Sequence, residues 1–121
     1  MAKQQEIGRK GERLAIDYLE HKGYHILEVN WRFKRAEVDI IAQYDRTIIF
    51  VEVKTRSYDT FGAPDLAINS KKENLISSAA HAYIDQQKYE GAIRFDVISI
   101  VMGKNKMAQI EHIEDAFFLG L

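Results

Sequence analysis

The sequence predicts an α/β fold in which a mixed β-sheet is flanked by helices. An amphipathic helical pattern opens the chain, and a second helical pattern, which begins with a capping box, separates two groups of strand-like segments. The expected order is one helix, three strands, a second helix and one or two strands. With 121 residues, of which 46% are hydrophobic, we expect one domain over residues 1–121 with its own core.

Residues 5–22 form the first predicted helix. Small and apolar residues recur at helical spacing on one side of it, namely Ile7, Gly11, Leu14, Ala15, Tyr18 and Leu19. Glu12 falls at the edge of this stripe, and Gly23 is a typical residue at a helix C-terminus. Glu12 therefore lies either where the helix meets the sheet or in solvent beside Arg9 or Lys10.

Three strands are predicted next, over 24–33, 37–44 and 47–55. The last two are rich in β-branched and aromatic residues and are separated by Asp45-Arg46, which indicates a hairpin with a tight turn. If these two residues form the turn, Asp39 lies directly opposite Glu52, and Glu37 lies opposite Lys54. Opposed side chains on one face of a sheet have Cβ atoms about 5 Å apart.

Two carboxylates in that arrangement repel each other by roughly 3 kcal/mol at an effective dielectric constant near 20. A shared proton, Lys54 or a hard divalent cation would compensate for this repulsion. Oxygen ligands without cysteine favour Mg²⁺ or Mn²⁺ over zinc. Alternatively, Glu37 and Lys54 form a cross-strand ion pair and the other carboxylates point to solvent.

The second helix is predicted from Ser70 to about Gln87, because Ser70 and Glu73 have the spacing of a capping box. A strand over 92–101 and a weaker one over 107–113 follow. Asp96 in the first of these reads as a structural acid near Arg94 or the sheet edge, outside any site. The segment 56–64 reads as a long loop suited to substrate contact, and the apolar tail 116–119 as packing on the body or on a second subunit.

Several basic residues are candidate nucleic-acid contacts. They lie in predicted turns, loops and a helix start, and they are Arg32, Lys34, Arg35, Arg56 and Lys71. Lys71 and Lys72 both fall in the first helical turn, where the helix dipole disfavours cations and favours an anionic ligand. Trp31 offers a stacking surface. The alternatives are that these basic side chains are simply solvated and that Trp31 belongs to the core.

Asp39 followed by Glu52-Val53-Lys54 resembles the signature of the PD-(D/E)xK nuclease superfamily. More closely, the chain resembles the YraN-like family of small bacterial proteins, which is thought to be related to archaeal Holliday-junction resolvases. Val38 stands where the superfamily name has proline, and Ala36 where this family usually has glycine. The likeness extends over nearly the whole chain, through Gly11-Glu12, Gly23-Tyr24, Asn30-Trp31-Arg32, Glu37-Val38-Asp39, Phe50 to Arg56, Phe61-Gly62, Ser70-Lys71, Arg94-Phe95-Asp96 and Asp115-Ala116-Phe117.

The resemblance implies a restriction-endonuclease-like fold and metal-dependent endonuclease activity on structured DNA, branched DNA included. By the resemblance, Asp39 and Glu52 would hold Mg²⁺ or Mn²⁺, with the Val53 carbonyl as a third ligand. Glu12 would reach a second ion or a bound water, and Lys54 would position the attacking water. Glu37 would either tune Lys54 or assist the metal. A homodimer is implied as well, because cutting a symmetric junction requires paired sites.

Composition limits these expectations. A net charge of −1 gives no overall basic footprint, so nucleic-acid binding must rely on a local patch. The chain has no cysteine, signal-like start or long apolar run, which indicates a cytoplasmic protein without membrane association. Two rivals remain open: a non-catalytic nucleic-acid-binding protein with the same fold, and an assembly factor that recruits a partner through its apolar tail.

Overall fold

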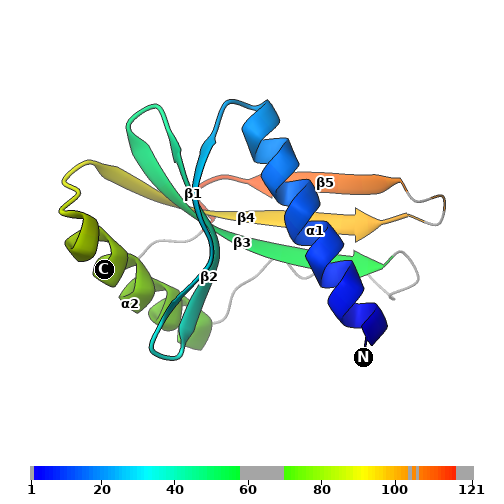
Figure 1. Ribbon diagram of the computed structural model, residues 1–121, viewed down its shortest axis with the longest axis horizontal. Coiled ribbons are helices and arrows are strands. Elements are labelled where there is room, and N and C mark those ends of the chain that lie inside the picture. Colours follow the sequence, from blue (N-terminus) through cyan, green and yellow to red (C-terminus); the bar gives the residue numbers. More distant parts are fainter. Residues whose placement is uncertain (1, 58–69, 104, 106, 117–121) are drawn as a thin grey trace.

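A computed structural model describes residues 2–57, 70–103, 105 and 107–116 of the chain. Helices lie on both faces of a five-stranded mixed sheet with the strand order β1-β2-β3-β4-β5 (Figure 1). The predicted α/β class and element order are confirmed. The elements are α1 (Ala2–His21), β1 (His25–Phe33), β2 (Ala36–Tyr44), β3 (Thr47–Ser57), α2 (Ser70–Gln87), β4 (Ala92–Met102) and β5 (Ala108–Ile113).

The end of α1 follows from Gly23, which has a φ of 95°. The backbone N–H of Tyr24 donates to the Leu19 carbonyl at 2.9 Å, and that of Gly23 donates to the Glu20 carbonyl at 3.0 Å. This pair of bonds is the Schellman motif, which satisfies carbonyls that the helix leaves without partners. The predicted helix end is therefore confirmed, and the chain turns directly into β1.

Each face of the sheet buries a separate hydrophobic cluster. Ala15 and Leu19 of α1 pack on Ile40, Ile49 and Val51, while α2 covers the other face. The second cluster includes Val38, Ile41, Ile48 and Phe50 from the sheet with Ile76, Ala79, Ala80 and Tyr83 from α2. In Figure 1 the two helices accordingly lie on different sides of the strands.

Helix α1 comes very close to β3 at Gly11. This residue is buried, and a Cβ atom added to it would overlap the Thr55 side chain. The missing side chain therefore lets the helix lie against the strand that carries Glu52 and Lys54. Glu12, the next residue, is held at the edge of the sheet by this contact.

The β2–β3 hairpin has a two-residue turn in which Asp45 and Arg46 have φ values of 47° and 66°. Positive φ at both positions is characteristic of the type I′ turn, whose twist suits a hairpin. The predicted register is confirmed from Tyr44↔Thr47 to Ile40↔Val51, where the ladder ends. The predicted pairs Asp39–Glu52 and Glu37–Lys54 lie beyond that point, and this part of the prediction is wrong.

The ladder ends because β2 changes face at Asp39. Val38 packs in the α2-side cluster and Ile40 in the α1-side cluster, although residues two apart on a regular strand share a face. Opposite this point on β1, Asn30 has a φ of 53°. Asparagine tolerates this left-handed conformation better than most residues. The two strands thus bend together away from β3, which opens a gap beside Asp39.

Strand β4 pairs in parallel with β3 and antiparallel with β5, so the sheet is mixed as predicted. Arg56 lies within β3, because that strand continues to Ser57. The rest of the predicted loop, residues 58–64, and residues 117–119 of the tail lie outside the described residues. Neither α1 nor α2, the helices in the described ranges, combines the length and apolar character needed to cross a membrane.

Candidate active site

A pocket of about 390 Å³ lies between β2, β3 and the start of α2. The residues around it come from the turn after β1, from the bent part of β2, from β3 and from α2. Five of the predicted site residues line it, together with Lys72, which the sequence did not predict as a site residue. The lining residues are Arg35, Ala36, Glu37, Asp39, Glu52, Lys71, Lys72, Leu75 and Ile76.

Asp39 points into the gap that the bend in β2 opens. Its Oδ2 accepts a hydrogen bond from the backbone N–H of Val53 at 2.8 Å, so the carboxylate takes a place that a ladder bond would otherwise fill. Burial, helped by the charges of Glu52 and Glu12, raises the pKa of Asp39 to about 7, although the Val53 hydrogen bond and Lys72 act in the opposite direction. Asp39 is therefore a carboxylate whose ionised form lacks sufficient positive partners.

Glu52 is 8% exposed and lies on the face of β3 that α2 covers. An ion pair joins its Oε1 to the Nζ of Lys72, in the first turn of α2. Asp39 and Glu52 line the same pocket, and the charge of Glu52 helps to raise the pKa of Asp39. The two acids are therefore close, although they are not directly paired across the hairpin.

Glu12 approaches the same group of acids from α1. Asn30 Nδ2 donates to Glu12 Oε1 at 3.0 Å, and the charge of Glu12 contributes to the raised pKa of Asp39. Of the two interpretations of Glu12, the structure places it at the helix–sheet boundary. Asn30 thus has two roles: its backbone makes the bend in β1, and its side chain holds Glu12 beside that bend.

Glu37 does not face Lys54 as predicted. Its Oε2 lies 3.0 Å from Arg32 Nε, and the Arg32 side chain is 79% exposed. Because β1 and β2 remain paired through Arg32↔Glu37 after β2 has left β3, the partner of Glu37 comes from β1. An exposed ion pair of this kind contributes little to stability.

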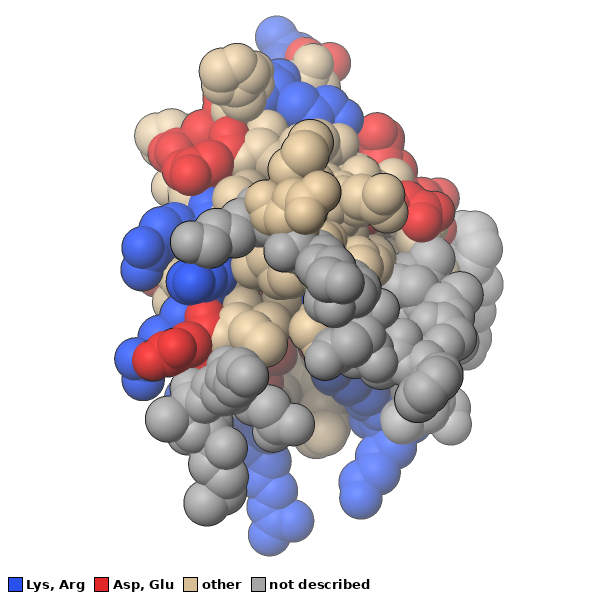
Figure 2. Space-filling view, turned by 90° about the vertical axis from the view of Figure 1, so that its right-hand side faces the viewer, with Lys and Arg blue, Asp and Glu red and all other residues tan. Residues whose placement is uncertain are grey.

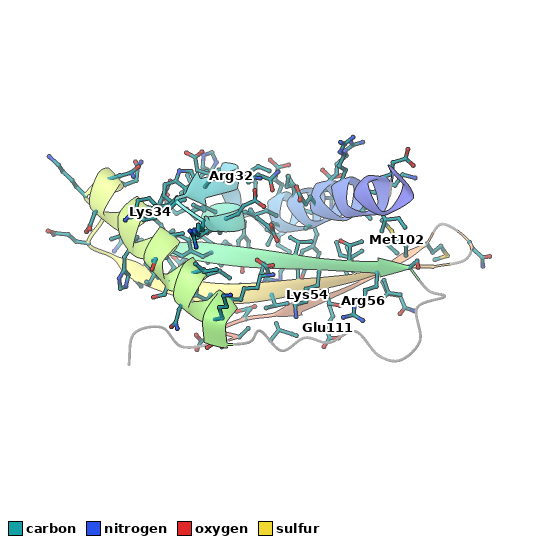
Figure 3. All side chains as sticks on the ribbon, turned by 90° about the horizontal axis from the view of Figure 1, so that it is seen from below. Arg32, Lys34, Lys54, Arg56, Met102 and Glu111 are labelled. Carbon is teal, nitrogen blue, oxygen red and sulfur yellow. The ribbon has the colours of Figure 1, made fainter. Side chains whose placement is uncertain are left out.

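Lys54 and Arg56 lie further along β3 on the same face as Glu52. Figure 3 shows both extending, with Glu111, from the side of the sheet opposite α1, while Arg32 and Lys34 lie at the other end of the sheet. In the described part of the chain, Lys54 and Arg56 are not among the residues that line the pocket. Of the predicted nucleic-acid contacts, Arg35 and Lys71 thus line the pocket, whereas Arg32, Lys34 and Arg56 do not belong to its described lining.

Trp31, which was a candidate stacking surface, packs toward α2. Its ring meets the Tyr83 ring edge-on, with centroids 5.3 Å apart, and it joins the hydrophobic cluster on that face. The core interpretation of Trp31 therefore agrees with the structure. Lys34 lies over the Phe33 ring, with Nζ 5.3 Å from its centroid.

The donor set fits a magnesium-like cation better than other metals. In the described ranges, no three side chains of Asp, Glu, His or Cys converge to form an all-protein cage. Mg²⁺ is usually held by one or two carboxylates and completes its shell with water and substrate phosphate. Asp39 and Glu52 would be such a pair of oxygen ligands. Zinc, which prefers nitrogen and sulfur ligands, does not suit them.

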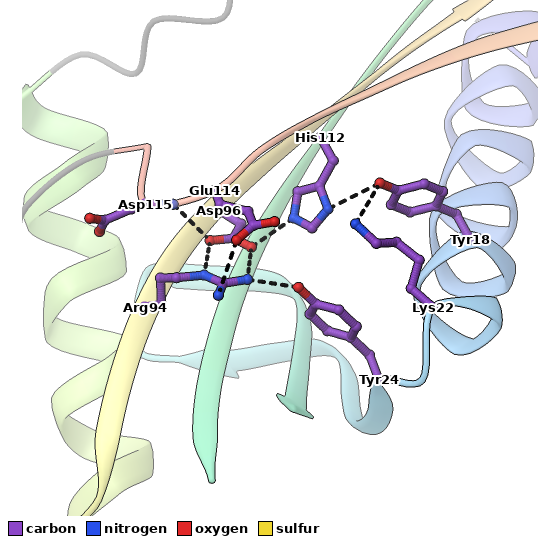
Figure 4. Close-up of polar contacts among 8 residues, drawn as sticks. All are labelled: Tyr18, Lys22, Tyr24, Arg94, Asp96, His112, Glu114 and Asp115. Carbon is purple, nitrogen blue, oxygen red and sulfur yellow. Dashed lines mark hydrogen bonds and ion pairs between the residues drawn. The ribbon is translucent and has the colours of Figure 1, made fainter. Parts of the chain in front are cut away.

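A second polar cluster surrounds Asp96, which is completely buried (Figure 4). Arg94 donates to both Asp96 oxygens at 2.8 Å, His112 Nε2 lies 2.7 Å from Oδ2, and the Asp115 N–H donates at 3.0 Å. Tyr24 completes the cluster by accepting from Arg94 at 2.7 Å. As expected from the sequence, Asp96 pairs with Arg94 away from the pocket.

Charges elsewhere on the surface are mixed. Figure 2 shows the side of the molecule that lies to the right in Figure 1, where Lys and Arg side chains form separate groups with acidic side chains between them. This distribution agrees with the net charge of −1. Because the chain has no overall basic charge, a nucleic-acid contact would rely on local groups of basic residues, such as the one that borders the pocket.

The sequence reasoning missed two residues that shape this site. Lys72 had one usable signal: a cation in the first turn of a helix is unfavourable unless an acid or a ligand lies nearby. Asn30 had a weaker one, since asparagine is enriched at positive φ but gives no indication of which asparagine adopts it.

Comparison with known proteins matches residues 11–100 to the model of a family described as "Uncharacterised protein family UPF0102". The chain is similar to a UPF0102 protein of Christiangramia forsetii, with 46% identity over 98% of each chain. It is also 49% identical to a UPF0102 protein of Thermodesulfovibrio yellowstonii, over 93% of this chain and 96% of that one. A Porphyromonas gingivalis relative is 41% identical over 97% of this chain and 87% of its own.

Proposed function

We propose that this chain, which belongs to the UPF0102 or YraN-like family, is a metal-dependent endonuclease. Its substrate class is structured DNA, branched DNA included, and its reaction is hydrolysis of a phosphodiester bond. The family description names no activity, so the proposal depends on the chemistry of the site. Its main support is that Asp39 and Glu52 share one pocket with Arg35, Lys71 and Lys72.

Acidic and basic residues at one pocket suit a phosphodiester substrate. Two carboxylates would repel a phosphate unless a divalent cation lay between them, and basic side chains at the rim attract the phosphate backbone. Asp39 and Glu52 would hold Mg²⁺ or Mn²⁺, as proposed from the resemblance, with the Val53 carbonyl as a further ligand. When bound, such a cation lowers the pKa of a bound water and offsets negative charge at the phosphate.

The other site residues have supporting roles in this proposal. Glu12, which Asn30 holds next to Asp39, would accept a hydrogen bond from a water in the site. Lys54 would orient the attacking water, as in the superfamily that the sequence resembles. Arg35 and Lys71 would contact DNA at the pocket, and Arg56 further along β3. Arg32 and Lys34 would add contacts at the β1–β2 end of the molecule.

Cleavage of branched, flapped and single-stranded DNA with Mg²⁺ or Mn²⁺ tests this function. The wild type should cleave at least one substrate, and Lys54→Ala should abolish turnover while leaving the metal-induced rise in melting temperature unchanged, because lysine is not a ligand. Lys10→Ala is the matched control, since Lys10 is an exposed lysine on α1. Wild-type rates in Lys54→Ala would contradict the assignment.

One observation favours a second candidate, a non-catalytic nucleic-acid-binding protein with this fold. Lys72 forms an ion pair with Glu52, so this acid has a charged partner within the protein and can serve the structure without a reaction. This candidate predicts DNA binding in chelator that added metal does not change, and no cleavage of any substrate. The same assays therefore separate the two candidates.

The proposal also includes a setting for the protein. We place it in the cytoplasm as a single domain that acts on DNA in preference to RNA. A homodimer would present two sites to a symmetric branched junction. Light scattering with and without a four-way DNA junction tests this arrangement, and a monomer with one bound junction arm would contradict it.

A further inference from the structure

Lys72 occupies an unusual position for a lysine. It lies in the first turn of α2, where the exposed N–H groups of the helix carry partial positive charge and disfavour a cation. Its ammonium group nevertheless turns inward to the Glu52 carboxylate, which is almost buried, while the Lys72 side chain is 45% exposed. The partner, and not the helix, therefore explains where this side chain lies.

The Lys72 charge acts on both acids of the pocket. It forms an ion pair with Glu52, and it opposes the rise in the pKa of Asp39 that burial and Glu52 produce. A divalent cation between the same two carboxylates would be close to the ammonium group and repelled by it. Lysine and cation therefore compete for the same carboxylate oxygens.

We propose that Lys72 is an internal counter-ion that a divalent cation displaces from Glu52, and that the displaced ammonium group then binds a DNA phosphate at the pocket. This inference rests on the proposed metal-dependent function, which it deepens by adding a regulatory step. Lys72, Lys71 and Arg35 all line the pocket, so the released side chain joins existing basic groups. Its long flexible stem permits this movement without a shift of the helix.

The displacement makes cation binding and DNA binding interdependent. Without a cation, Lys72 is held by Glu52 and contributes little to phosphate binding. With a cation, Lys72 is available to DNA, so the cation increases the affinity for DNA. By thermodynamic linkage, DNA must increase the affinity for the cation by the same factor. The site is thus most complete when cation and substrate are both bound.

The first test measures Mg²⁺ binding to the full chain by calorimetry. Lys72→Met should bind Mg²⁺ about tenfold more tightly than the wild type, the effect of removing one positive charge from a partly screened site. Lys72→Gln should behave alike, and it provides a second variant that can still donate a hydrogen bond to Glu52 if the methionine variant folds poorly. Lys71→Met is the matched control and should change the affinity by less than about twofold.

The second test measures the affinity for labelled branched DNA with chelator and with Ca²⁺, which also binds oxygen ligands. The cation should increase the affinity of the wild type for DNA, and this increase should be lost in Lys72→Met. The control Lys71→Met should bind DNA more weakly in both conditions but keep the increase.

The outcomes separate this inference from the proposed function. If the wild type and both Lys72 variants bind Mg²⁺ equally, Lys72 is not a competing counter-ion, while the metal-dependent function stands. If Lys71→Met gains as much affinity for Mg²⁺ as Lys72→Met, the specific role of Lys72 is likewise overturned. If only the Lys72 variants bind Mg²⁺, the lysine excludes the cation and is not displaced by it, which overturns the inference. If no variant binds Mg²⁺, both the inference and the metal-dependent function fail.

Discussion

Asp39 and Asp96 are both acids on interior strands of the same sheet, yet their surroundings have opposite effects on their charge. Asp96 has hydrogen bonds from Arg94 and from the Asp115 N–H, with His112 also in contact. Among the described residues, Asp39 accepts a backbone hydrogen bond from Val53. It has two acidic neighbours, Glu52 and Glu12, against the weaker effect of the Lys72 charge. Burial tends to raise the pKa of each, but in Asp96 the bonds from His112, Arg94 and Asp115 more than offset it and lower the pKa.

The difference distinguishes an acid that holds the fold together from one that is suited to a ligand. Asp96 joins residues on β4, β5 and the segments that follow α1 and β5, and its charge is fully compensated by them (Figure 4). Asp39 retains negative charge that the protein does not fully balance. A cation at the pocket would supply the missing positive charge, which is why the proposed function depends on Asp39.

The largest effect on stability is expected from Asp96→Asn. This change keeps the shape of the side chain but removes the buried charged partner of Arg94, which retains the more exposed Glu114. Breaking a buried ion pair costs about 3–5 kcal/mol. Urea unfolding monitored by circular dichroism measures this loss. If the free energy of unfolding falls by less than about 1 kcal/mol, as for an exposed pair, the Asp96 cluster does not stabilise the fold. The contrast with Asp39 would then be removed.

A smaller effect of opposite sign is expected from Asp39→Asn. In chelator at neutral pH the variant should be more stable than the wild type, by at least about 1 kcal/mol, because it removes the repulsion from Glu52 and Glu12. The asparagine oxygen can still accept the Val53 N–H. Added Mg²⁺ should raise the melting temperature of the wild type only. A clearly less stable variant, with no response to metal in either protein, would make Asp39 a structural acid like Asp96.

The advantage of Asp39→Asn should depend on pH. The native pKa of Asp39 is about 7 against an ordinary value of 3.8, so between these values the folded state binds more protons than the unfolded state. The contribution of Asp39 to wild-type stability therefore decreases as pH rises through this range, by at most about 1.4 kcal/mol per pH unit. Unfolding of both proteins should be measured across this pH range. The difference in their free energies of unfolding should vanish at the acidic end. A constant difference would contradict the raised pKa.

The smallest effect is expected from Arg32→Ala, which breaks the ion pair with Glu37. Both side chains are substantially exposed, and exposed pairs are worth about 0–1 kcal/mol. Thermal melts at low and high salt should give the variant a free energy of unfolding within this amount of the wild-type value. A loss as large as that of Asp96→Asn would mean that exposure does not separate the pairs in this protein, and the comparison would need another physical basis.

Much of the fold follows from local sequence. The predicted register near Asp45-Arg46 is correct because a two-residue turn fixes which residues face each other, and alternation carries that register along the hairpin. The register fails at Asp39 because the bend depends on the conformation of Asn30 in the neighbouring strand. A pattern read along one strand does not contain that information.

The candidate site was predictable in its acids and less so in its cations. Asp39 and Glu52 could be expected near each other because their strands form one hairpin, although the predicted direct pairing is wrong. The partner of Glu52, in contrast, comes from α2, which follows only after a long connection. The bond between Arg94 and Asp96 was foreseeable because the two residues are near neighbours on one strand. The contacts of Asp96 with His112 and Asp115 depend on the pairing of β4 and β5 and were not.

The parallel pairing of β3 with β4 has a consequence for how the chain folds. The β1–β2–β3 meander needs only short turns, so it can form from local contacts, whereas β4 can join β3 only after α2 and its connections have been traversed. Closing such a long loop is entropically costly and slows folding. We therefore expect the strands that carry Asp39 and Glu52 to pair first. The addition of β4, with Arg94 and Asp96, should be the late step that makes the native state long-lived.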